Sequence, residues 1–339
     1  MTVDLGESFI SLESKEIEEN KYISKGLDLL NVNNVSINPN NGNNIIVNYN
    51  DMGIGVSFDK GNTYDMVQMI NLKKDWKYNS YGSLFIPNSN IVLTTWTNRH
   101  NLLTSPLEDN EDIKGGLSIS YDNGITHKVI DYFNEDSLPI DIKYFNNEVY
   151  VCIYNYGVYK TNDLINFYCI TNNLDENYFY RVEYYKNKIY LLISEPSSNY
   201  GKIYYLENDK WKNIDLPKDS YVPTDFIFYN DKMYLSFMTS KNKNDYPYSW
   251  MGGGAYEYDL NNKEYNEILN NTKSVMDLNI YNDNLYIVGY QFNPIRYNLK
   301  NNKIEEILKN DYNNFNKIVI TDNNIYLATA GIGLWIINR

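Results

Sequence analysis

The sequence has 339 residues, of which 43% are hydrophobic and 22% are charged, and its formal net charge at pH 7 is −13. An acidic surface repels phosphate groups, so we expect neither general nucleic-acid binding nor docking on anionic lipid. The longest apolar runs are the length of strands, which argues against a membrane span. The first residues lack the basic and apolar regions of a secretory signal. We therefore expect cytoplasmic synthesis, with any release occurring by lysis or as part of a particle.

A short pattern of polar residues followed by an apolar, often Tyr-containing strand recurs seven times. The copies begin 40 to 58 residues apart, close to the period of about 40–50 residues that is typical of a four-stranded propeller blade. Length alone would suggest two domains, but the repeat predicts one domain over residues 1–339. The copies lie at residues 44–47, 90–93, 148–151, 188–191, 232–235, 284–287 and 324–327.

Each copy sits within the same series of predicted strands. A strand and a tight Asn/Asp turn come before it, since Asn and Asp tolerate left-handed backbone angles. Gly or Pro opens the strand that follows, and most copies then offer a fourth short strand. We therefore predict an all-β, seven-bladed β-propeller of four-stranded antiparallel blades. The approximate blade bounds are 34–70, 78–130, 138–171, 178–216, 221–269, 274–308 and 313–339, the last completed by 21–30.

The ends of the chain suggest how the ring closes. The last predicted blade stops after its third strand, whereas the region around residues 22–30 is strand-like and has no place in the repeat. Propellers commonly hide open strand edges by letting one end of the chain complete the blade of the other. We therefore predict that residues 21–30 pair with the strand at residues 333–338.

The composition also bears on source and redox state. The chain has 35 Tyr and abundant Asn and Lys, a mixture typical of an AT-rich genome such as that of a low-GC bacterium or its phage. The two cysteines, Cys152 and Cys169, fall on the predicted second and fourth strands of one blade. Two strand spacings are about 9–10 Å, beyond the Cα separation of about 7 Å that a disulfide allows. We expect two free thiols in a reducing compartment.

The turn after the third strand has a distinctive sequence in the first two blades. A Ser, Asp, Gly and Thr recur there at fixed spacing and are followed by Tyr64 or His127; the turns hold Ser57, Asp59, Gly61 and Thr63, and Ser120, Asp122, Gly124 and Thr126. A third copy at residues 161–167 lacks the Gly. Asp can accept turn amide hydrogens, Gly supplies the positive φ, and the hydroxyls tie the hairpin together.

These turns resemble the Asp-box, also called the BNR repeat, of sialidase-like and sortilin-like propellers. The resemblance implies a folding element on the face opposite the binding site. Members of this superfamily include sialidases, other glycoside hydrolases, lectins, sorting receptors and assembly factors. Sialidases bind a carboxylate with three converging Arg, but Arg99, Arg181 and Arg296 fall in blades two, four and six, and the early Phe-Arg-Ile-Pro segment is missing. The sequence therefore argues against sialidase activity.

Two loops between second and third strands are enlarged, at residues 94–115 and 238–253. They carry aromatic and basic side chains that suit a sugar ring or an apolar patch of a partner. The candidate binding residues are Trp96, Arg99 and His100 in the first loop, and Tyr246, Tyr248 and Trp250 in the second. The alternative is that both loops merely pack over the mouth of the ring.

A second set of candidates comes from counting eight residues back from each repeated strand. Five consecutive blades then place a charged residue at the start of the innermost strand, beside the central channel. The positions are Ile37, Ser83, Asp141, Arg181, Asp225, Asp277 and Lys317. This ring could hold a ligand, a cation or a side chain of a partner, or it could be a polar, water-filled channel lining.

Three hypotheses for function remain open. The first is a non-enzymatic binding or assembly module for a glycan or protein partner, and one form of this hypothesis is a structural or receptor-binding component of a phage tail or related particle. The second is a glycoside hydrolase that uses two carboxylates about 5–10 Å apart, drawn from Asp141, Asp225 and Asp277, with Glu183 and Glu195 as further candidates. The third is a scaffold without ligand chemistry. Neither a phosphate loop nor a zinc motif occurs, so no cofactor and no metal are expected.

Overall fold

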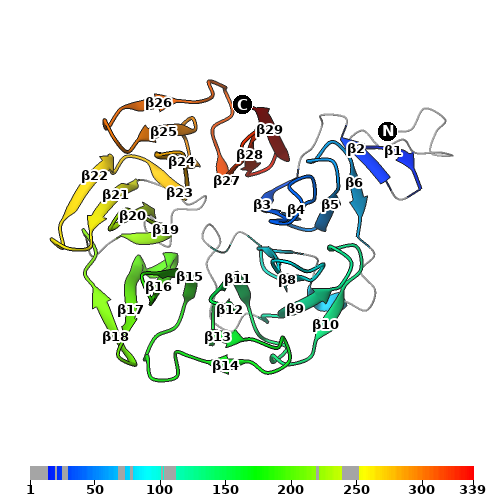
Figure 1. The fold of residues 1–339 in the computed structure, drawn as a ribbon, viewed down its shortest axis with the longest axis horizontal. Coiled ribbons are helices and arrows are strands. Elements are labelled where there is room, and N and C mark those ends of the chain that lie inside the picture. The colour runs from blue at the N-terminus through cyan, green and yellow to red at the C-terminus, as the bar shows by residue number, and fades with distance from the viewer. Residues whose placement is uncertain are drawn as a thin grey trace.

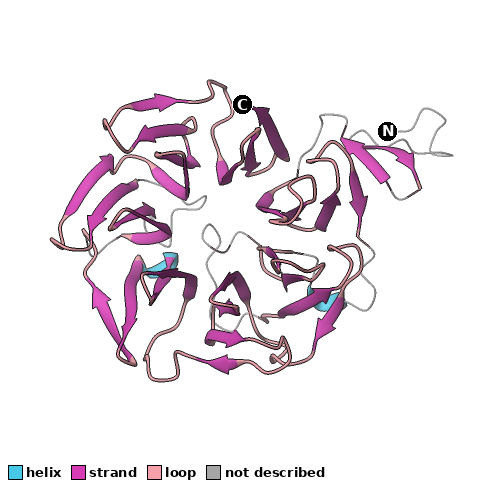
Figure 2. Ribbon diagram, in the orientation of Figure 1, coloured by secondary structure: helices cyan, strands magenta, loops and turns pink. Residues whose placement is uncertain are grey.

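The computed structural model describes residues 14–19, 21–24, 30–67, 73–76, 79–100, 102, 112–218, 221–238 and 252–339. Its strands form seven antiparallel sheets arranged as blades around a common axis (Figure 1). Helical structure in the described residues is confined to two short 3-10 turns, at Lys74–Trp76 and Pro196–Ser198 (Figure 2). The predicted all-β, seven-bladed propeller is thus confirmed.

The strands follow the repeat closely. Blade one contains β3 (Val32–Ile37), β4 (Ile45–Tyr49), β5 (Gly53–Ser57) and β6 (Tyr64–Met66). Blade two contains β7 (Ser83–Phe85), β8 (Val92–Thr97), β9 (Gly115–Ser120) and β10 (Lys128–Ile130). Blade three contains β11 (Pro139–Phe145), β12 (Glu148–Ile153), β13 (Gly157–Thr161) and β14 (Tyr168–Cys169). Blade four contains β15 (Phe179–Tyr185), β16 (Lys188–Glu195), β17 (Tyr200–Glu207) and β18 (Lys210–Ile214).

The remaining blades continue the series. Blade five contains β19 (Val222–Tyr229), β20 (Lys232–Met238), β21 (Gly253–Asp259) and β22 (Tyr265–Leu269). Blade six contains β23 (Ser274–Tyr281), β24 (Asn284–Tyr290), β25 (Ile295–Asn298) and β26 (Ile304–Glu306). Blade seven contains β27 (Phe315–Ile320), β28 (Asn324–Thr329) and β29 (Leu334–Asn338). Within each blade the first strand is the innermost (Figure 1).

Turn chemistry explains why these strands pair in register. The first and second strands of blades three to six are joined by two-residue turns in which both residues have positive φ. Asn, Asp and Lys occupy these positions, and a pair of left-handed residues matches the twist of a hairpin. The pairs are Asn146–Asn147, Lys186–Asn187, Asn230–Asp231 and Asn282–Asp283.

The apolar core lies between neighbouring blades. One cluster joins Leu93 and Leu117 of blade two to Val149 and Val151 of blade three. A second cluster joins blade one to blade seven, with Val47 of β4 packed in the same group as Tyr326 and Ala328 of β28. Each sheet thus buries its faces against its neighbours, which an isolated hairpin could not do, and apolar packing runs across the seam between the ends of the chain.

The predicted strand exchange at the ring closure is wrong for residues 21–24, while residues 25–29 of the predicted strand lie outside the described residues. Residues Lys21–Ser24 form β2, which pairs with β6 of blade one and with β1 (Ser14–Glu18), so that the first sheet has six strands. The pairing places Lys21 opposite Asp65, a favourable cross-strand charge pair. Blade seven has three strands in the described part of the chain. It meets blade one through a hydrogen bond from Gly333 N to Leu30 O (2.8 Å) and a bridge between Asn31 and Ala330.

Candidate functional site

The innermost strands share an irregularity that defines the candidate site. In six blades the register slips by one residue near the start of the innermost strand, which marks a β-bulge and re-aims the side chain that follows. We call the residues after the slip, together with Ser83 of blade two, the axial ring. Its members are Asn34, Ser83, Asp141, Arg181, Asp225, Asp277 and Lys317.

Six of these seven positions agree with the count made from the sequence. In blade one the ring residue is Asn34, which pairs with Asn48, and not Ile37, which pairs with Ile45. The reason is that the turn at residues 38–44 is longer than a two-residue hairpin turn. Hydrogen bonds of Asn side chains stabilise this longer turn. A fixed offset from the second strand therefore lands three residues too late in this blade.

The three aspartates of the axial ring join neighbouring blades. Each uses one carboxylate oxygen to accept a backbone N–H from the innermost strand of the next blade. The bonds run from Val182 to Asp141 (3.1 Å), from Leu278 to Asp225 (3.0 Å) and from Ile318 to Asp277 (2.9 Å). Leaving a buried amide without this acceptor would lower the free energy of unfolding by about 1–3 kcal/mol. These carboxylates therefore stabilise the fold, whatever else they do.

Basic side chains occupy the other oxygens of the same carboxylates. Arg181 lies between two of them, with Nη1 3.6 Å from Asp141 Oδ1 and Nε 3.7 Å from Asp225 Oδ1. Lys317 Nζ lies 2.5 Å from Asp277 Oδ1. Two residues further along the innermost strands, Lys143 of β11 pairs with Glu183 of β15. The ring is therefore a network of ion pairs rather than a set of free carboxylates.

Burial and neighbouring charge separate the pKa values of Asp225 and Asp277. Burial raises the pKa of Asp277 to about 7, and the charge of Asp225 acts in the same direction, against the pull of Lys317. Burial opposes the ionisation of Asp225 as well, but Lys317, Arg181 and Lys143 lower its pKa below the ordinary value. Burial also raises the pKa of Glu183. The network therefore contains one carboxyl group that gives up its proton less readily than an ordinary Asp, and one that gives it up more readily.

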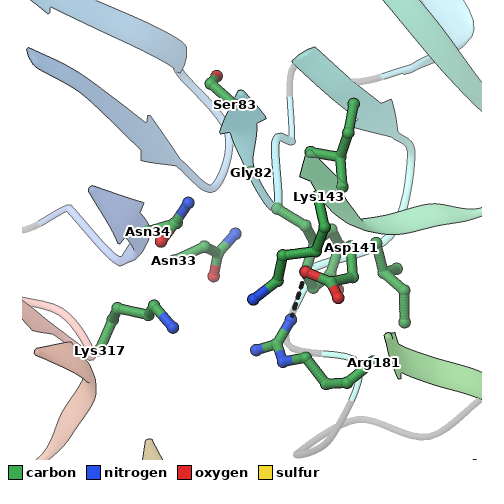
Figure 3. Close-up of a pocket in the computed structure, with 11 residues that line it drawn as sticks. Asn33, Asn34, Gly82, Ser83, Asp141, Lys143, Arg181 and Lys317 are labelled. Carbon is green, nitrogen blue, oxygen red and sulfur yellow. Dashed lines mark ion pairs between the residues drawn. The ribbon is translucent and has the colours of Figure 1, made fainter. Parts of the chain in front are cut away.

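A cavity of about 170 Å³ opens on one side of the axial ring. In Figure 3 the side chains of Lys143 and Arg181 reach into one space from one side, and Lys317 reaches into it from the other side, next to Asn33 and Asn34. Three cations and one carboxylate, that of Asp141, belong to its wall. The full lining comes from five blades and comprises Asn33, Asn34, Tyr81, Gly82, Ser83, Ile140, Asp141, Ile142, Lys143, Arg181 and Lys317.

Lys143 and Asn33 also belong to this site, although they were not among the residues predicted from the sequence. Lys143 follows Asp141 by two residues on β11, and residues i and i+2 of a strand share a face, so strand periodicity could have identified it. Asn33 is the bulge residue of β3, and nothing in the sequence marks the position of a bulge. Lys143 pairs with Glu183 of blade four, and Asn33 donates to Ser80 O of blade two; no local pattern reveals such contacts between blades.

The candidates in the first enlarged loop have different outcomes. Trp96 is completely buried within β8, where its Nε1–H donates to Ser118 Oγ (2.6 Å), so the prediction that it is a loop residue open to a ligand is wrong. Arg99 is half-buried and its charge acts on the Tyr81 hydroxyl, while His100 is exposed. Leu102 is buried and its amide donates to Tyr81 Oη (3.0 Å), so this part of the loop packs against the ring.

The other candidates lie elsewhere. Tyr246, Tyr248 and Trp250 fall outside the described residues. Glu195 accepts hydrogen bonds from Ser198 and stabilises the turn that follows β16. Arg296 pairs with Glu305 between the two outer strands of blade six, so it does not converge with Arg181. Both cysteines are free, Cys152 being buried on the second strand of its blade and Cys169 half-buried on the fourth.

The predicted turn motifs form the hydrogen bonds expected of them. In blade one, Ser57 Oγ donates to Asp59 Oδ1 (2.8 Å), and Asp59 also accepts from the backbone N–H and hydroxyl of Thr63 (2.8 and 2.7 Å). Ser120, Asp122 and Thr126 repeat this pattern in blade two. Gly61 and Gly124 have φ of 94° and 101°. A Cβ at Gly61 would also meet Ile336 Cδ1 at 2.6 Å, so this glycine permits close packing against blade seven.

His127 closes the second turn from inside the fold. It is fully buried, with Nε2 3.0 Å from Gly124 O and Nδ1 2.9 Å from Ser118 Oγ. Since a carbonyl can only accept, Nε2 carries the proton, and Nδ1 accepts from the hydroxyl that in turn accepts from Trp96. Burial lowers the pKa of His127 to about 4, against the hydrogen bond to Gly124 and the charge of Asp122.

The described residues contain no helix with both the length and the apolar character needed to cross a membrane. They also contain no group of three or more His, Cys, Asp or Glu side chains placed to hold a metal ion.

Comparison with known proteins yields structural neighbours. No protein-family model and no curated protein matches the sequence. YCF48 from Cyanidioschyzon merolae matches with a TM-score of 0.66 and 11% identity, covering 91% of this chain and 96% of that chain. A structure of YCF48 bound to D1 peptide matches with a TM-score of 0.65 and 13% identity, covering 96% and 98% of the two chains.

An enzyme is found among the neighbours as well. The GH74 xyloglucanase from Xanthomonas campestris matches with a TM-score of 0.68 and 10% identity, covering 92% of this chain and 52% of that chain. At such identities the likeness concerns the fold, and these neighbours are seven-bladed β-propellers. The same fold thus carries a peptide-bound protein and a glycosidase.

Proposed function

We propose that this protein is a non-enzymatic binding module that binds a protein partner on the side of the axial ring where the cavity opens. The observation that carries the proposal is the cavity of about 170 Å³, into which polar groups from five blades converge. A few convergent polar groups around a concave site are the usual mark of a binding site. The neighbour whose title names a bound D1 peptide supports a protein partner by analogy of fold.

A second candidate is a glycoside hydrolase, with a glycan as the ligand. Asp225 and Asp277 favour it, because two neighbouring carboxyl groups whose pKa values are driven apart are typical of an acid and a base. The xyloglucanase neighbour favours it as well. Against it, Asp277 is completely buried and engaged by Ile318 and Lys317. Asp225 and Asp277 are also close enough to share a hydrogen bond, which leaves no room between them for a glycosidic bond.

Further proposals concern the family to which the turn motifs belong and the place where the protein is made and acts. We propose that the turns after β5 and β9 are Asp-boxes, on the strength of their residues and hydrogen bonds. From the composition we further propose cytoplasmic synthesis and a role in a phage tail or related particle.

Selection of peptides from a random library tests the binding proposal. Peptides captured by the purified protein are re-measured against Arg181→Gln, which alters the axial ring, and against Tyr121→Ser, which alters an exposed turn between β9 and β10. We expect binding to fall with Arg181→Gln and to persist with Tyr121→Ser. The opposite pattern would place the partner on the other face. Thermal unfolding of each variant distinguishes lost binding from lost folding.

Turnover assays test the hydrolase candidate. Chromogenic glycosides and xyloglucan oligosaccharides are incubated with the wild-type protein and with Asp277→Asn. We expect no turnover above background. Hydrolysis by the wild type that Asp277→Asn abolishes, without unfolding the protein, would replace the binding proposal with the enzymatic one.

A further inference from the structure

We propose that the cavity beside the axial ring is an anion subsite that takes one carboxylate group of the partner, either an acidic side chain or a chain end. The inference rests on the proposed function and adds the chemistry of the ligand. Its basis is the local charge. Lys143, Arg181 and Lys317 line the cavity with Asp141 as their single lining carboxylate, which gives the wall a formal charge of +2 in a chain whose net charge is −13.

The carboxylates that balance two of these cations lie outside the cavity wall. Glu183 pairs with Lys143 and Asp277 pairs with Lys317, yet neither carboxylate belongs to the lining. Asp141 does belong to it, but one of its oxygens already accepts the amide of Val182. A ligand in the cavity therefore meets the ammonium groups of Lys143 and Lys317 on the side away from their carboxylate partners. On that side the partners cancel the least of the positive potential.

Arg181 retains hydrogen-bonding capacity for a ligand. Its ion pairs with Asp141 and Asp225 are 3.6 and 3.7 Å long, beyond the usual range of about 2.7–3.2 Å for an N–H···O hydrogen bond. Its Nε is buried and has no hydrogen-bond partner among the described residues. A planar guanidinium with free donors matches the two oxygens of a carboxylate, and the geometry in Figure 3 leaves it facing the cavity.

Size and charge both select a single carboxylate. The cavity of about 170 Å³ is close to the roughly 150 Å³ that accommodates one benzene molecule, so it takes one side chain and not a pair of sugar rings. The wider network holds four carboxylates, those of Asp141, Glu183, Asp225 and Asp277, against three cations. A dianion such as phosphate loses more hydration free energy than a carboxylate when it enters a partly buried site, because the desolvation cost of an ion rises steeply with its charge.

Three probes test the proposal by calorimetry at low ionic strength. The first is an acetylated and amidated Gly-Gly-Glu-Gly-Gly peptide, which offers only a side-chain carboxylate. The second is acetylated pentaglycine, which offers only a chain end, and the third is inorganic phosphate. We expect millimolar binding of at least one peptide, weakening as salt is added because the attraction is between charges. Binding of one peptide and not the other identifies the source of the carboxylate.

Two variants with opposite predictions test where the probe binds. Glu183→Gln removes a carboxylate behind Lys143 and leaves the lining intact, so we expect tighter binding. The double variant Lys143→Gln/Glu183→Gln removes the ion pair as a unit, which leaves the net charge of the network unchanged but takes a cation from the wall. One charge-assisted hydrogen bond is worth about 1.5–3 kcal/mol, so binding should weaken by about tenfold or more.

A matched control uses an ion pair far from the cavity. The double variant Lys186→Gln/Asp231→Asn removes the exposed pair between the turns of blades four and five, and it should bind the peptides as the wild type does. Folding of all variants is checked by thermal unfolding. The proposal is overturned if a folded Lys143→Gln/Glu183→Gln binds as well as the wild type, if neither peptide binds wild type or Glu183→Gln, or if phosphate binds tighter than both peptides. Each of these results leaves the peptide-library test of the proposed function intact.

Discussion

The turns after β5 and β9 and the axial ring are both built from Asp side chains that accept backbone N–H groups, yet they differ in range. In the turns, Asp59 and Asp122 bind residues four positions away. In the axial ring, Asp141, Asp225 and Asp277 bind amides 41, 53 and 41 positions away, each on the next blade. The turns stabilise a hairpin and the ring ties blades together. The same chemistry is therefore local and exposed in one region, and long-range and buried in the other.

The largest effect that this contrast predicts belongs to Asp277. Asp277→Ala leaves the amide of Ile318 without its acceptor and the ammonium of Lys317 without its partner, in a site where Asp277 is fully buried. Breaking a buried pair from one side costs about 3–5 kcal/mol. We expect the free energy of unfolding in urea to fall by that amount.

A paired variant separates burial from pairing. In Asp277→Asn/Lys317→Met both charges are removed together and the amide oxygen can still accept from Ile318, so most of the stability should return. If Asp277→Ala proves no more harmful than the exposed turn variants below, the axial ring does not tie the blades together.

The next largest effect is a pH dependence of stability caused by His127, the buried residue that closes the turn after β9. Its pKa of about 4 lies below the ordinary value of about 6.5. The unfolded chain therefore takes up the proton first, and the stability of the fold falls as the pH decreases from about 6.5 to 4, by about 3 kcal/mol. Above pH 6.5 both states are neutral at this residue and the effect is absent.

A matched variant isolates this slope from the titration of carboxylates. His127→Gln stays neutral and can still donate to Gly124, so its unfolding free energy should decline less between pH 6.5 and 4 than that of the wild type. Parallel profiles for the two proteins would mean that His127 is protonated in the fold. The Trp96–Ser118–His127 chain of hydrogen bonds would then have to be rearranged.

The exposed turns should give smaller effects. Asp59→Ala and Asp122→Ala each remove acceptors for a backbone N–H and two hydroxyls in partly exposed sites. Water replaces part of what is lost, so we expect a decrease of about 1–2 kcal/mol in unfolding free energy for each. Asp59→Asn, which keeps one acceptor oxygen, should be milder. A loss as large as that of Asp277→Ala would remove the distinction between the two regions.

The same distinction explains what the sequence could predict. The turn motif is complete within seven residues, so Ser57 to Thr63 could be identified together with their bonds. The seven blades and six of the seven ring positions follow from a period. Three features depend on packing between segments far apart. They are the bulge at Asn33, the longer turn that makes Asn34 instead of Ile37 the ring residue of blade one, and the burial of Trp96. Strand closure failed for a related reason: a strand-like segment does not specify which of two open edges it joins.

The smallest expected effect is that of the hairpin β1–β2. It contacts the ring through two residue pairs between β2 and β6, Lys21 with Asp65 and Tyr22 with Tyr64, and residues 15–18 of β1 are exposed. Blade one already has its own four strands without it. Deletion of residues 1–24 should therefore change the unfolding free energy by less than about 1 kcal/mol, since a short exposed strand pair contributes about 0.2–1 kcal/mol. A loss of several kcal/mol would mean that this end of the chain contributes to closing the ring at blade seven. Pairing of a cysteine placed in residues 1–12 with one placed on β29 would then locate the contact.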